Sequence, residues 1–365
     1  MVKLDEVKTL NAALLAESRR PLIGVFLGGT SGIGHMTARA LTSSAQQANG
    51  HAPRVYLVGR SEQRGREIVE ELKGICPAGT YRFVRAEDLS LMACVDAVCA
   101  EITRLEGQEQ EPRIDYLMTS HGGAIFQPRK DTKEGLDVTM AMMYYSRMRA
   151  IQQLKPLLLK SELPAAVVSV FAAGFEAKLF RDDLSLRDPQ HYSYLQARSH
   201  LCHMHSAYLA KLAETHSDDT TGKLRLVHIF PGLVLTSAFD NPAYPAWFRF
   251  LFNRILVPLF LRPFVAVDSD ESAARMLSLA SPVLYPAANV GDGGGETGTG
   301  GAVRGMDGSL GSGAYSLDWK GDDIHNRKAY AKLGDDGEVE ALKNQVWEHT
   351  NKAFEIIAAG KCFTE

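Results

Sequence analysis

The stretch that decides the fold is LGGTSGIGHMTARAL, residues 27–41, close to the start of the chain. Three glycines, Gly28, Gly32 and Gly34, follow an apolar run and precede a stretch with helical spacing. Glycines at these places let the chain reverse tightly, let the backbone approach a pyrophosphate, and leave the first amides of a helix pointing at the anion. The pattern predicts a nucleotide-binding turn formed by Gly28, Thr30, Ser31, Gly32, Ile33 and Gly34.

Short β-branched runs alternate with helical stretches from residue 22 to about residue 235. The runs are apolar on both faces, as the strands of a parallel sheet covered by helices must be. Alternation at this spacing predicts a doubly wound α/β sheet of the Rossmann type. We expect strands at 22–28, 54–59, 81–86, 114–120, 165–171 and 225–231, and helices at 35–47, 62–74, 92–105, 132–160 and 192–214.

The rest of the chain is expected to extend this single domain at both ends. Residues 1–20 predict an N-terminal helical extension, and the α/β domain is expected to span 21–290. Of the 23 residues at 291–313, 11 are glycine, which predicts a flexible surface loop. Residues 314–365 then predict a last edge strand and a closing helix.

Composition narrows the class of protein. With 365 residues, of which 45% are hydrophobic, the chain can bury a large core. Its net charge of -3 offers no general attraction to nucleic acid or to anionic membranes. The five cysteines are scattered and form no disulfide framework or metal pattern, which favours a reducing compartment. The first 20 residues lack the apolar stretch of a secretion signal, so we expect a cytoplasmic protein.

One apolar segment, residues 244–267, leaves two interpretations open. Its three arginines and three prolines make it a poor transmembrane helix, because charges near the middle of a bilayer are costly. The favoured interpretation is a lid over an apolar substrate pocket, within residues 240–267. The other is a helix that lies in a membrane interface, with arginines at the headgroups and with Trp247 and Phe250 below them.

Two residues after the predicted strands bear on the nucleotide. Arg60 follows the second strand, where the adenosine ribose of a dinucleotide would lie. An acidic residue at this place would bind the ribose hydroxyl, whereas an arginine suits a 2′-phosphate. We therefore expect NADP(H) rather than NAD(H). Asp88, followed by Leu89, ends the third strand, where its carboxylate can accept a hydrogen bond from the adenine amino group.

The ordered motifs resemble those of the short-chain dehydrogenase/reductase family over residues 20–240, and the whole chain is most similar to divergent fungal members, many of which act in secondary metabolism. The motifs are the glycine turn, DLS, IDYLMTSHGG and FPGLVLT. The resemblance implies cofactor contacts by Ser120 and Gly122 and nicotinamide contacts by Pro231, Gly232 and Thr236. It also implies a homodimer formed through the helices expected at 132–160 and 192–214.

The same resemblance shows a changed catalytic tetrad. Members reduce a carbonyl with a tyrosine as proton donor, assisted by serine, lysine and asparagine. Here Ala172 stands at the serine position and Met143 at the asparagine position, while Gln196 follows Tyr192 at the lysine spacing. Three of the four groups are thus replaced, and without the lysine the phenol of Tyr192 is expected to stay protonated.

A second register keeps a cation beside a phenol. Tyr194 and Arg198 stand four residues apart and therefore share a helix face. An arginine cannot lose its proton, but its charge can still lower the pKa of a neighbouring tyrosine. Tyr192 is favoured as the catalytic acid because the Tyr-Ser start and Ala197 fit the family pattern better, and Tyr194 with Arg198 is the alternative.

Other titratable residues lie near the motifs. His121, His191, Tyr144 and Tyr145 are candidates for acid–base chemistry. Helical positions 200, 203 and 205 also carry histidines, but no carboxylate or cysteine cluster accompanies them, so we expect packing roles and no metal site.

Three functions are compatible with these residues. The favoured one is an NADP(H)-dependent oxidoreductase that reduces a carbonyl or an enone of a lipophilic metabolite. The missing tetrad groups keep a second function open, a non-redox isomerase, dehydratase or cyclase on the same scaffold. The third is a catalytically silent nucleotide-binding module.

Overall fold

The sheet has the parallel, doubly wound order that the alternating pattern predicts. A computed structural model of the chain describes residues 3–17, 20–122, 128–215, 224–236, 246–261, 266–288 and 302–365. Seven strands form one sheet in the order β3-β2-β1-β4-β5-β6-β9, and all neighbouring pairs are parallel. The strands are β1 (Ile23–Leu27), β2 (Arg54–Gly59), β3 (Thr80–Arg85), β4 (Tyr116–Thr119), β5 (Ala165–Val170), β6 (Leu224–Ile229) and β9 (Ala314–Leu317).

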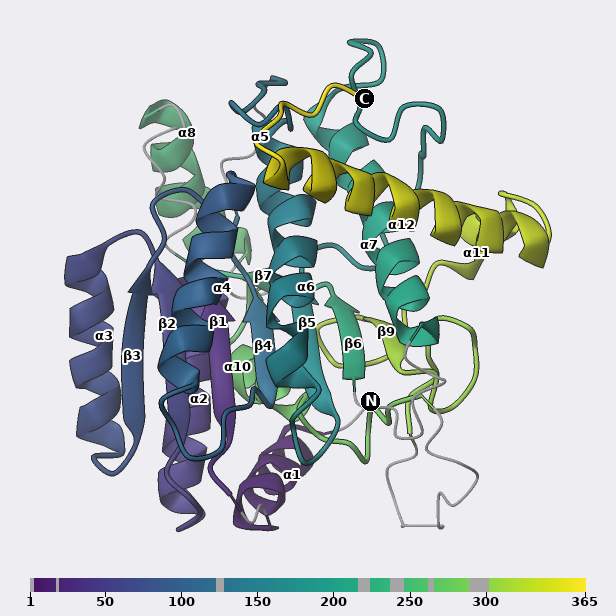
Figure 1. Ribbon diagram of the computed structural model, residues 1–365. Helices are drawn as coiled ribbons and strands as arrows, with labels where there is room; N and C mark the ends of the chain where they lie inside the picture. The colour runs from purple at the N-terminus through teal and green to yellow at the C-terminus, as the bar shows by residue number, and fades with distance from the viewer. Residues whose placement is uncertain are drawn as a thin grey trace.

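Helices cover both faces of this sheet (Figure 1). One layer holds α1 (Leu4–Glu17), α2 (Gly32–Gln47), α3 (Glu62–Ile75) and α10 (Ser269–Ser278), which pack against one another. The other layer holds α4 (Met92–Glu106), α6 (Ser146–Leu158) and α7 (Tyr194–Glu214). Each layer shares a separate hydrophobic core with the sheet. The shorter elements are α5 (Val138–Met140), η1 (Ala141–Tyr145), α8 (Ala246–Leu251), η3 (Phe252–Leu261), α11 (Arg327–Ala331) and the two-stranded ribbon β7 (Leu233–Val234) and β8 (Ala266–Val267).

The burial pattern explains why the central strands are apolar throughout. All five residues of β1 are buried, and alternate side chains enter the two cores. Ile23 and Val25 face the core under α4 and α6, whereas Phe26 faces the core under α2. A strand covered on both sides has no face for polar residues, which is the arrangement expected of a parallel sheet.

The C-terminal helix α12 (Asp336–Ala358) lies across the outer side of the second helical layer (Figure 1). Trp347 stacks on Tyr208 of α7 with ring centres 4.8 Å apart, and the Tyr144 hydroxyl forms a 2.8 Å hydrogen bond with Thr350. Part of the outer surface of α7 and η1 is therefore in contact with the chain's own helix. The homodimer stays a prediction, and a contact through these helices would have to include α12.

The helix expected at 132–160 is shorter than predicted. Gly135 adopts a φ of +85°, which no helix accommodates, and Asp131 pairs with Asp137 in an antiparallel bridge. The helix begins only after Asp137, whose carboxylate accepts the amide of Met140 and caps α5. The π-helical turn η1 then joins α5 to α6. The apolar pattern predicted which face of the helix is covered. It did not predict that Asp137, within the expected range, caps the start of the helix.

Two segments that the sequence singled out are described only in part. Of the loop expected at 291–313, residues 291–301 lie outside the described residues, and Arg304 bridges Leu310 in the remainder. Of the segment at 240–267, residues 246–261 form α8 and η3, Ala266–Val267 form β8, which pairs with β7 before the segment, and residues 240–245 and 262–265 lie outside the described residues. No helix in the described ranges is long and apolar enough to cross a membrane.

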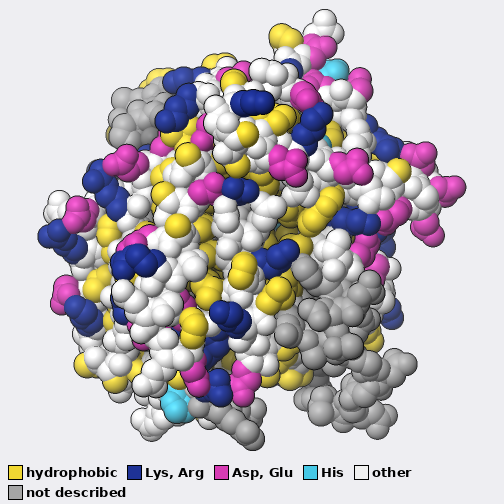
Figure 2. Space-filling view, in the orientation of Figure 1, with side chains coloured by type: hydrophobic (Ala, Val, Ile, Leu, Met, Phe, Trp, Pro, Cys, Tyr) yellow, Lys and Arg dark blue, Asp and Glu magenta, His cyan; other side chains and the backbone are white. Residues whose placement is uncertain are grey.

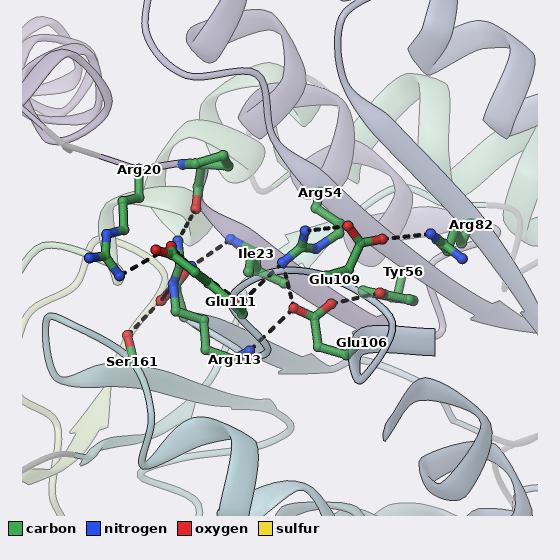
Figure 3. A network of polar contacts seen from close by, with 12 residues as sticks. Arg20, Ile23, Arg54, Tyr56, Arg82, Glu106, Glu109, Glu111, Arg113 and Ser161 are labelled. Atoms are coloured by element: carbon green, nitrogen blue, oxygen red, sulfur yellow. Dashed lines mark hydrogen bonds and ion pairs between the residues drawn. The ribbon is translucent and has the colours of Figure 1, made fainter. Parts of the chain in front are cut away.

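A charged network ties the amino ends of three strands together (Figure 3). The Glu106 carboxylate, which is fully buried, accepts a 2.6 Å hydrogen bond from Tyr56 and pairs with Arg54 at 2.5 Å. Arg113 donates its amide to the same carboxylate, and its guanidinium pairs with Asp115 at 3.2 Å. A buried carboxylate needs such partners, because losing one leaves an uncompensated charge.

Glu106→Gln is expected to lower the free energy of unfolding by about 2 kcal/mol, because the largely buried Arg54 would lose the nearer of its two carboxylate partners and keep only Glu109. Urea unfolding followed by circular dichroism measures the change. Glu101→Gln is the matched control, since Glu101 pairs with Arg104 on the exposed side of the same helix. The control should lose less than about 1 kcal/mol. Equal losses in the two variants would show that the buried network does not stabilise the sheet.

Candidate active site

Backbone atoms packed around the glycine turn leave no room for a Cβ atom on Gly28 or Gly34. A Cβ on Gly28, which has a φ of +89°, would lie 2.7 Å from the backbone nitrogen of His121. A Cβ on Gly34 would lie 2.6 Å from the carbonyl oxygen of Gly28. The side chain of Ser31, the N-cap residue of α2, makes no capping hydrogen bond. The first amides of α2 are therefore left without a side-chain cap, the arrangement in which a helix N-terminus can bind an anion.

The ends of β2 and β3 carry the residues expected near the adenosine. Arg60 is exposed directly after β2 and makes no hydrogen bond or ion pair with the described residues. Asp88 is also exposed, and one of its carboxylate oxygens accepts the amide and hydroxyl of Ser90 at 2.9 and 2.7 Å. Its other oxygen is not used in these bonds. Leu89 is buried, and Thr30 packs on Gly59, a position where any larger residue would collide with it.

The segment after β4 packs directly behind the glycine turn. The Ser120 hydroxyl donates to the Leu27 carbonyl at 3.3 Å. A Cβ on Gly122 would lie 3.3 Å from the terminal methyl of Met143, so the residue at the asparagine position does lie beside this segment. His121 is buried and shares a 2.7 Å hydrogen bond with Ser146. Burial and the neighbouring Arg147 lower the pKa of His121 to about 3, which keeps it neutral.

Arg147 is a buried cation that the sequence analysis missed. Its side chain is 1% exposed and donates to the carbonyls of His121 and Val170, each at 2.6 Å, and to the Ser169 hydroxyl at 3.2 Å. None of these acceptors is a carboxylate. Burial lowers its pKa to about 9, so the guanidinium remains charged at neutral pH. The signal for it was one arginine on the apolar face of the helix expected at 132–160.

Ala172, at the serine position, is held by an oriented chain of hydrogen bonds. Its amide donates to Nε2 of His228 at 3.3 Å, which requires Nδ1 of a neutral His228 to carry the proton and donate to Ser206. Ser206 in turn donates to the Glu176 carboxylate at 2.9 Å, and this carboxylate is almost fully buried. Burial lowers the pKa of His228 to about 3 and raises the pKa of Glu176. The chain fixes the turn after β5.

Tyr192 lies just before α7, and its side chain points toward the start of α5. Ser193 caps α7, so the helix begins at Tyr194. The Tyr192 hydroxyl donates to the Asp137 carboxylate at 3.1 Å, and burial together with this carboxylate raises its pKa to about 12. The proton is therefore held firmly at neutral pH.

One face of α7 meets the end of β5. Cys202 donates to the Ala172 carbonyl at 3.0 Å, and Arg198, one turn earlier, lies 4.3 Å above the ring of Phe175. Phe175 in turn packs edge-on against Phe230, the residue before Pro231, at 4.8 Å. Residues four apart share a helix face, so Tyr194 belongs to the face that carries Arg198 and Cys202.

The turn after β6 closes the site. Gly232 has a φ of +71°, and a Cβ there would lie 2.7 Å from Val267 and 3.1 Å from Trp319. Thr236 lies against the glycine turn, because a Cβ on Gly32 would come within 3.3 Å of its methyl group. The structure thus brings the predicted nicotinamide segment and the predicted phosphate turn side by side.

The other titratable candidates face away from this site. The Tyr145 hydroxyl bonds to His349 of α12 at 2.8 Å, and the Tyr144 hydroxyl also points to α12. His191 bonds to Asp183 at 2.9 Å, and His200 bridges the amide of Phe180 and the carbonyl of Leu184. Acid–base roles for the two tyrosines are not supported by these positions. No group of three metal-binding side chains occurs within the described ranges.

Comparisons with known proteins agree with this geometry. No family model matches the chain. It is 36% identical over 351 residues to an oxidoreductase of Emericella nidulans, a match that covers 96% of this chain and 97% of the relative. It is 31% identical over 346 residues to a short-chain dehydrogenase/reductase of Stachybotrys chartarum, covering 92% of this chain and 93% of that protein.

Solved structures show the same fold at low sequence identity. The NADP complex of RhlG from Pseudomonas aeruginosa is 22% identical with a TM-score of 0.50, covering 72% of this chain and 91% of that one. An NADP-bound 3-oxoacyl-(acyl-carrier-protein) reductase from Agrobacterium tumefaciens is 18% identical with a TM-score of 0.51, covering 75% and 90%. These likenesses concern the fold.

The stability of the protein is expected to depend on the neutral form of His228. The folded-state pKa is about 3, against 6.5 for a free histidine, so only the unfolded chain binds this proton near pH 5. This contribution is complete above about pH 6.5 and is lost as the pH falls toward 3. In His228→Gln, whose amide oxygen can still accept the Ala172 amide, stability should fall less steeply with acid, by up to about 1.4 kcal/mol per pH unit. Unfolding free energies measured from pH 7.5 to pH 5 test this, and parallel curves would contradict it.

Proposed function

The chain belongs to the short-chain dehydrogenase/reductase family, and we propose that it is an NADP(H)-dependent oxidoreductase that reduces a carbonyl or an enone of a lipophilic secondary metabolite. The chain matches relatives that are named as oxidoreductases or as a short-chain dehydrogenase/reductase. These matches cover between 92% and 98% of the chain, which is an enzyme of that class. The observation that carries the proposal is the glycine turn, where backbone atoms occupy the space of any Cβ on Gly28 or Gly34.

The residues at the carboxyl edge of the sheet fit a nicotinamide dinucleotide. When bound, the cofactor supplies the hydride. The amides at the start of α2 would hold the pyrophosphate, because a helix N-terminus attracts anions. Arg60 would bind the 2′-phosphate of NADP(H), and the oxygen of Asp88 left over from its bonds to Ser90 would accept the adenine amino group. The other contacts that we propose are from Thr30, Ser31, Gly32, Ile33, Leu89, Ser120, Gly122, Pro231, Gly232 and Thr236.

We assign the proton donor to Tyr194 with Arg198, the alternative register of the tetrad. Tyr194 shares its helix face with Arg198 and Cys202, and that face meets Ala172 and the turn after β6. The charge of Arg198 favours the phenolate that forms as the proton leaves. Tyr192 remains the second candidate, but its hydroxyl already donates to the carboxylate of Asp137.

The buried charge of Arg147 suits a site in which a carbonyl oxygen becomes negative. Arg147 places a positive charge beneath the ends of β4 and β5, with no carboxylate among its acceptors. A positive charge in a low-dielectric interior stabilises an oxygen that gains negative charge, as a carbonyl oxygen does when hydride adds to its carbon. Arg147 therefore supports the transition state of hydride transfer to a carbonyl.

A non-redox isomerase, dehydratase or cyclase is the second candidate. The observation that favours it is the replacement of three tetrad groups by Ala172, Met143 and Gln196. Such an enzyme would form product without changing the oxidation state of the cofactor. A silent binding module would form no product at all.

Arg60→Ala is expected to weaken the binding of NADPH by about 10- to 100-fold, because a charged hydrogen bond to the 2′-phosphate is lost. The affinity for NADH should stay nearly constant, because that cofactor lacks the phosphate. Titration by isothermal calorimetry measures both. An equal loss for the two cofactors, or no loss for either, would remove Arg60 from the 2′-phosphate site.

Tyr194→Phe is expected to lower kcat at least about 100-fold, because a general acid in the transition state contributes that much. NADPH oxidation is followed with the most reactive ketone or enone found in a substrate panel, and NADPH binding should not change. Tyr192→Phe is the matched control and should keep most of the activity. If Tyr192→Phe alone abolished turnover, the catalytic register would be that of Tyr192.

A further inference from the structure

The helical segment formed by α8 and η3 presents apolar side chains to the outside. Trp247 and Phe250 are 67% and 65% exposed, and Leu251 and Ile255 are 39% and 38% exposed. Phe250, Leu251 and Ile255 follow Trp247 by three, four and eight residues. The four side chains therefore lie along one side of the segment. Figure 1 shows α8 at the upper left edge of the molecule, apart from the helices that cover the sheet.

This exposure argues against a lid that only covers the site. A lid over an apolar pocket turns its apolar side chains inward, whereas four large ones here face solvent. Isolated apolar residues on a surface are ordinary, but a cluster on one short segment marks an interaction site.

The charge of the segment indicates which partner it fits. Residues 246–261 contain two arginines and no acidic residue, and Arg254 is exposed among the apolar side chains. In contrast, basic and acidic side chains are intermingled on the face shown in Figure 2. A second copy of the chain, whose mixed charges sum to only -3, offers a basic segment far less negative charge than the surface of an anionic bilayer does. Apolar side chains beside an exposed arginine match the interface of an anionic lipid bilayer.

We propose that the exposed face of α8 and η3 inserts into the surface of an anionic membrane. Trp247 and Phe250 enter the interface, and Arg254 contacts lipid phosphates. This contact does not depend on the proposed function.

The location of the segment gives the contact a consequence for the enzyme. The segment leaves the turn after β6 and returns in β8, where Val234 pairs with Val267. Gly232 of the same turn packs against Val267. Membrane binding would therefore bring the turn that carries Pro231 and Gly232 near the bilayer. If the proposed function is correct, the substrate class is a metabolite that partitions into lipid and enters from it.

Sedimentation of the full chain with lipid vesicles tests the proposal. We expect binding to vesicles of phosphatidylcholine and phosphatidylserine, and clearly weaker binding to phosphatidylcholine alone. A double variant that combines Trp247→Ala and Phe250→Ala should have a partition coefficient onto the vesicles at least about tenfold lower. Arg254→Gln should weaken binding about fivefold, and only to the anionic vesicles.

Leu310→Ala is the matched control, because Leu310 is 60% exposed in the turn before β9, at the opposite edge of the sheet. It should bind vesicles as the unchanged chain does. The altered side chains are exposed, so thermal unfolding should be the same in all variants. Equal sedimentation of the double variant and the unchanged chain would overturn the proposal. The proposal would also be overturned if the chain self-associated in the absence of vesicles and Phe250→Ala abolished that self-association. The partner of this face would then be a second copy of the chain. Cofactor titration of the same samples tests the proposed function separately.

Discussion

The structure depends on how closely the turn after β1 approaches the end of β4. The backbone at Gly28 lies so near His121 that no side chain fits between them, and Gly34 lies equally close to the carbonyl of Gly28. This contact sets where α2 begins and leaves its first amides facing the carboxyl edge of the sheet. The other site residues follow strands that end at the same edge, so their positions are fixed by the sheet rather than by their own loops.

Beneath that edge, buried polar groups hold the ends of the strands together. Arg147 joins the end of β4 to the end of β5 through three hydrogen bonds. The chain from Ala172 through His228 and Ser206 to Glu176 fixes the next turn. In the proposed register, Ala172 and Met143 at the serine and asparagine positions would make no polar contact to a substrate, and Arg147 would leave a buried positive charge beneath the same strand ends.

The sequence predicted the sheet and most of its helices, because the apolar runs follow from burial on both faces. It also predicted which turns lie together, since parallel strands end at one edge. The start of α5 was misplaced, because Gly135 and the N-cap Asp137 set it, and the polar residues 132–134 before them fit an exposed helical turn as well as a loop. Arg147 and His228 were missed for a related reason. Each is a single polar residue in an apolar pattern, and only the fold shows which buried acceptors it reaches.

The central claim is that this turn binds a phosphorylated nicotinamide dinucleotide beside an altered tetrad. Calorimetric titration of the unchanged chain with NADPH and with NADH tests it most directly. The account predicts saturable binding at one site per chain, with NADPH bound more tightly than NADH. No heat and no saturation with either cofactor would contradict it.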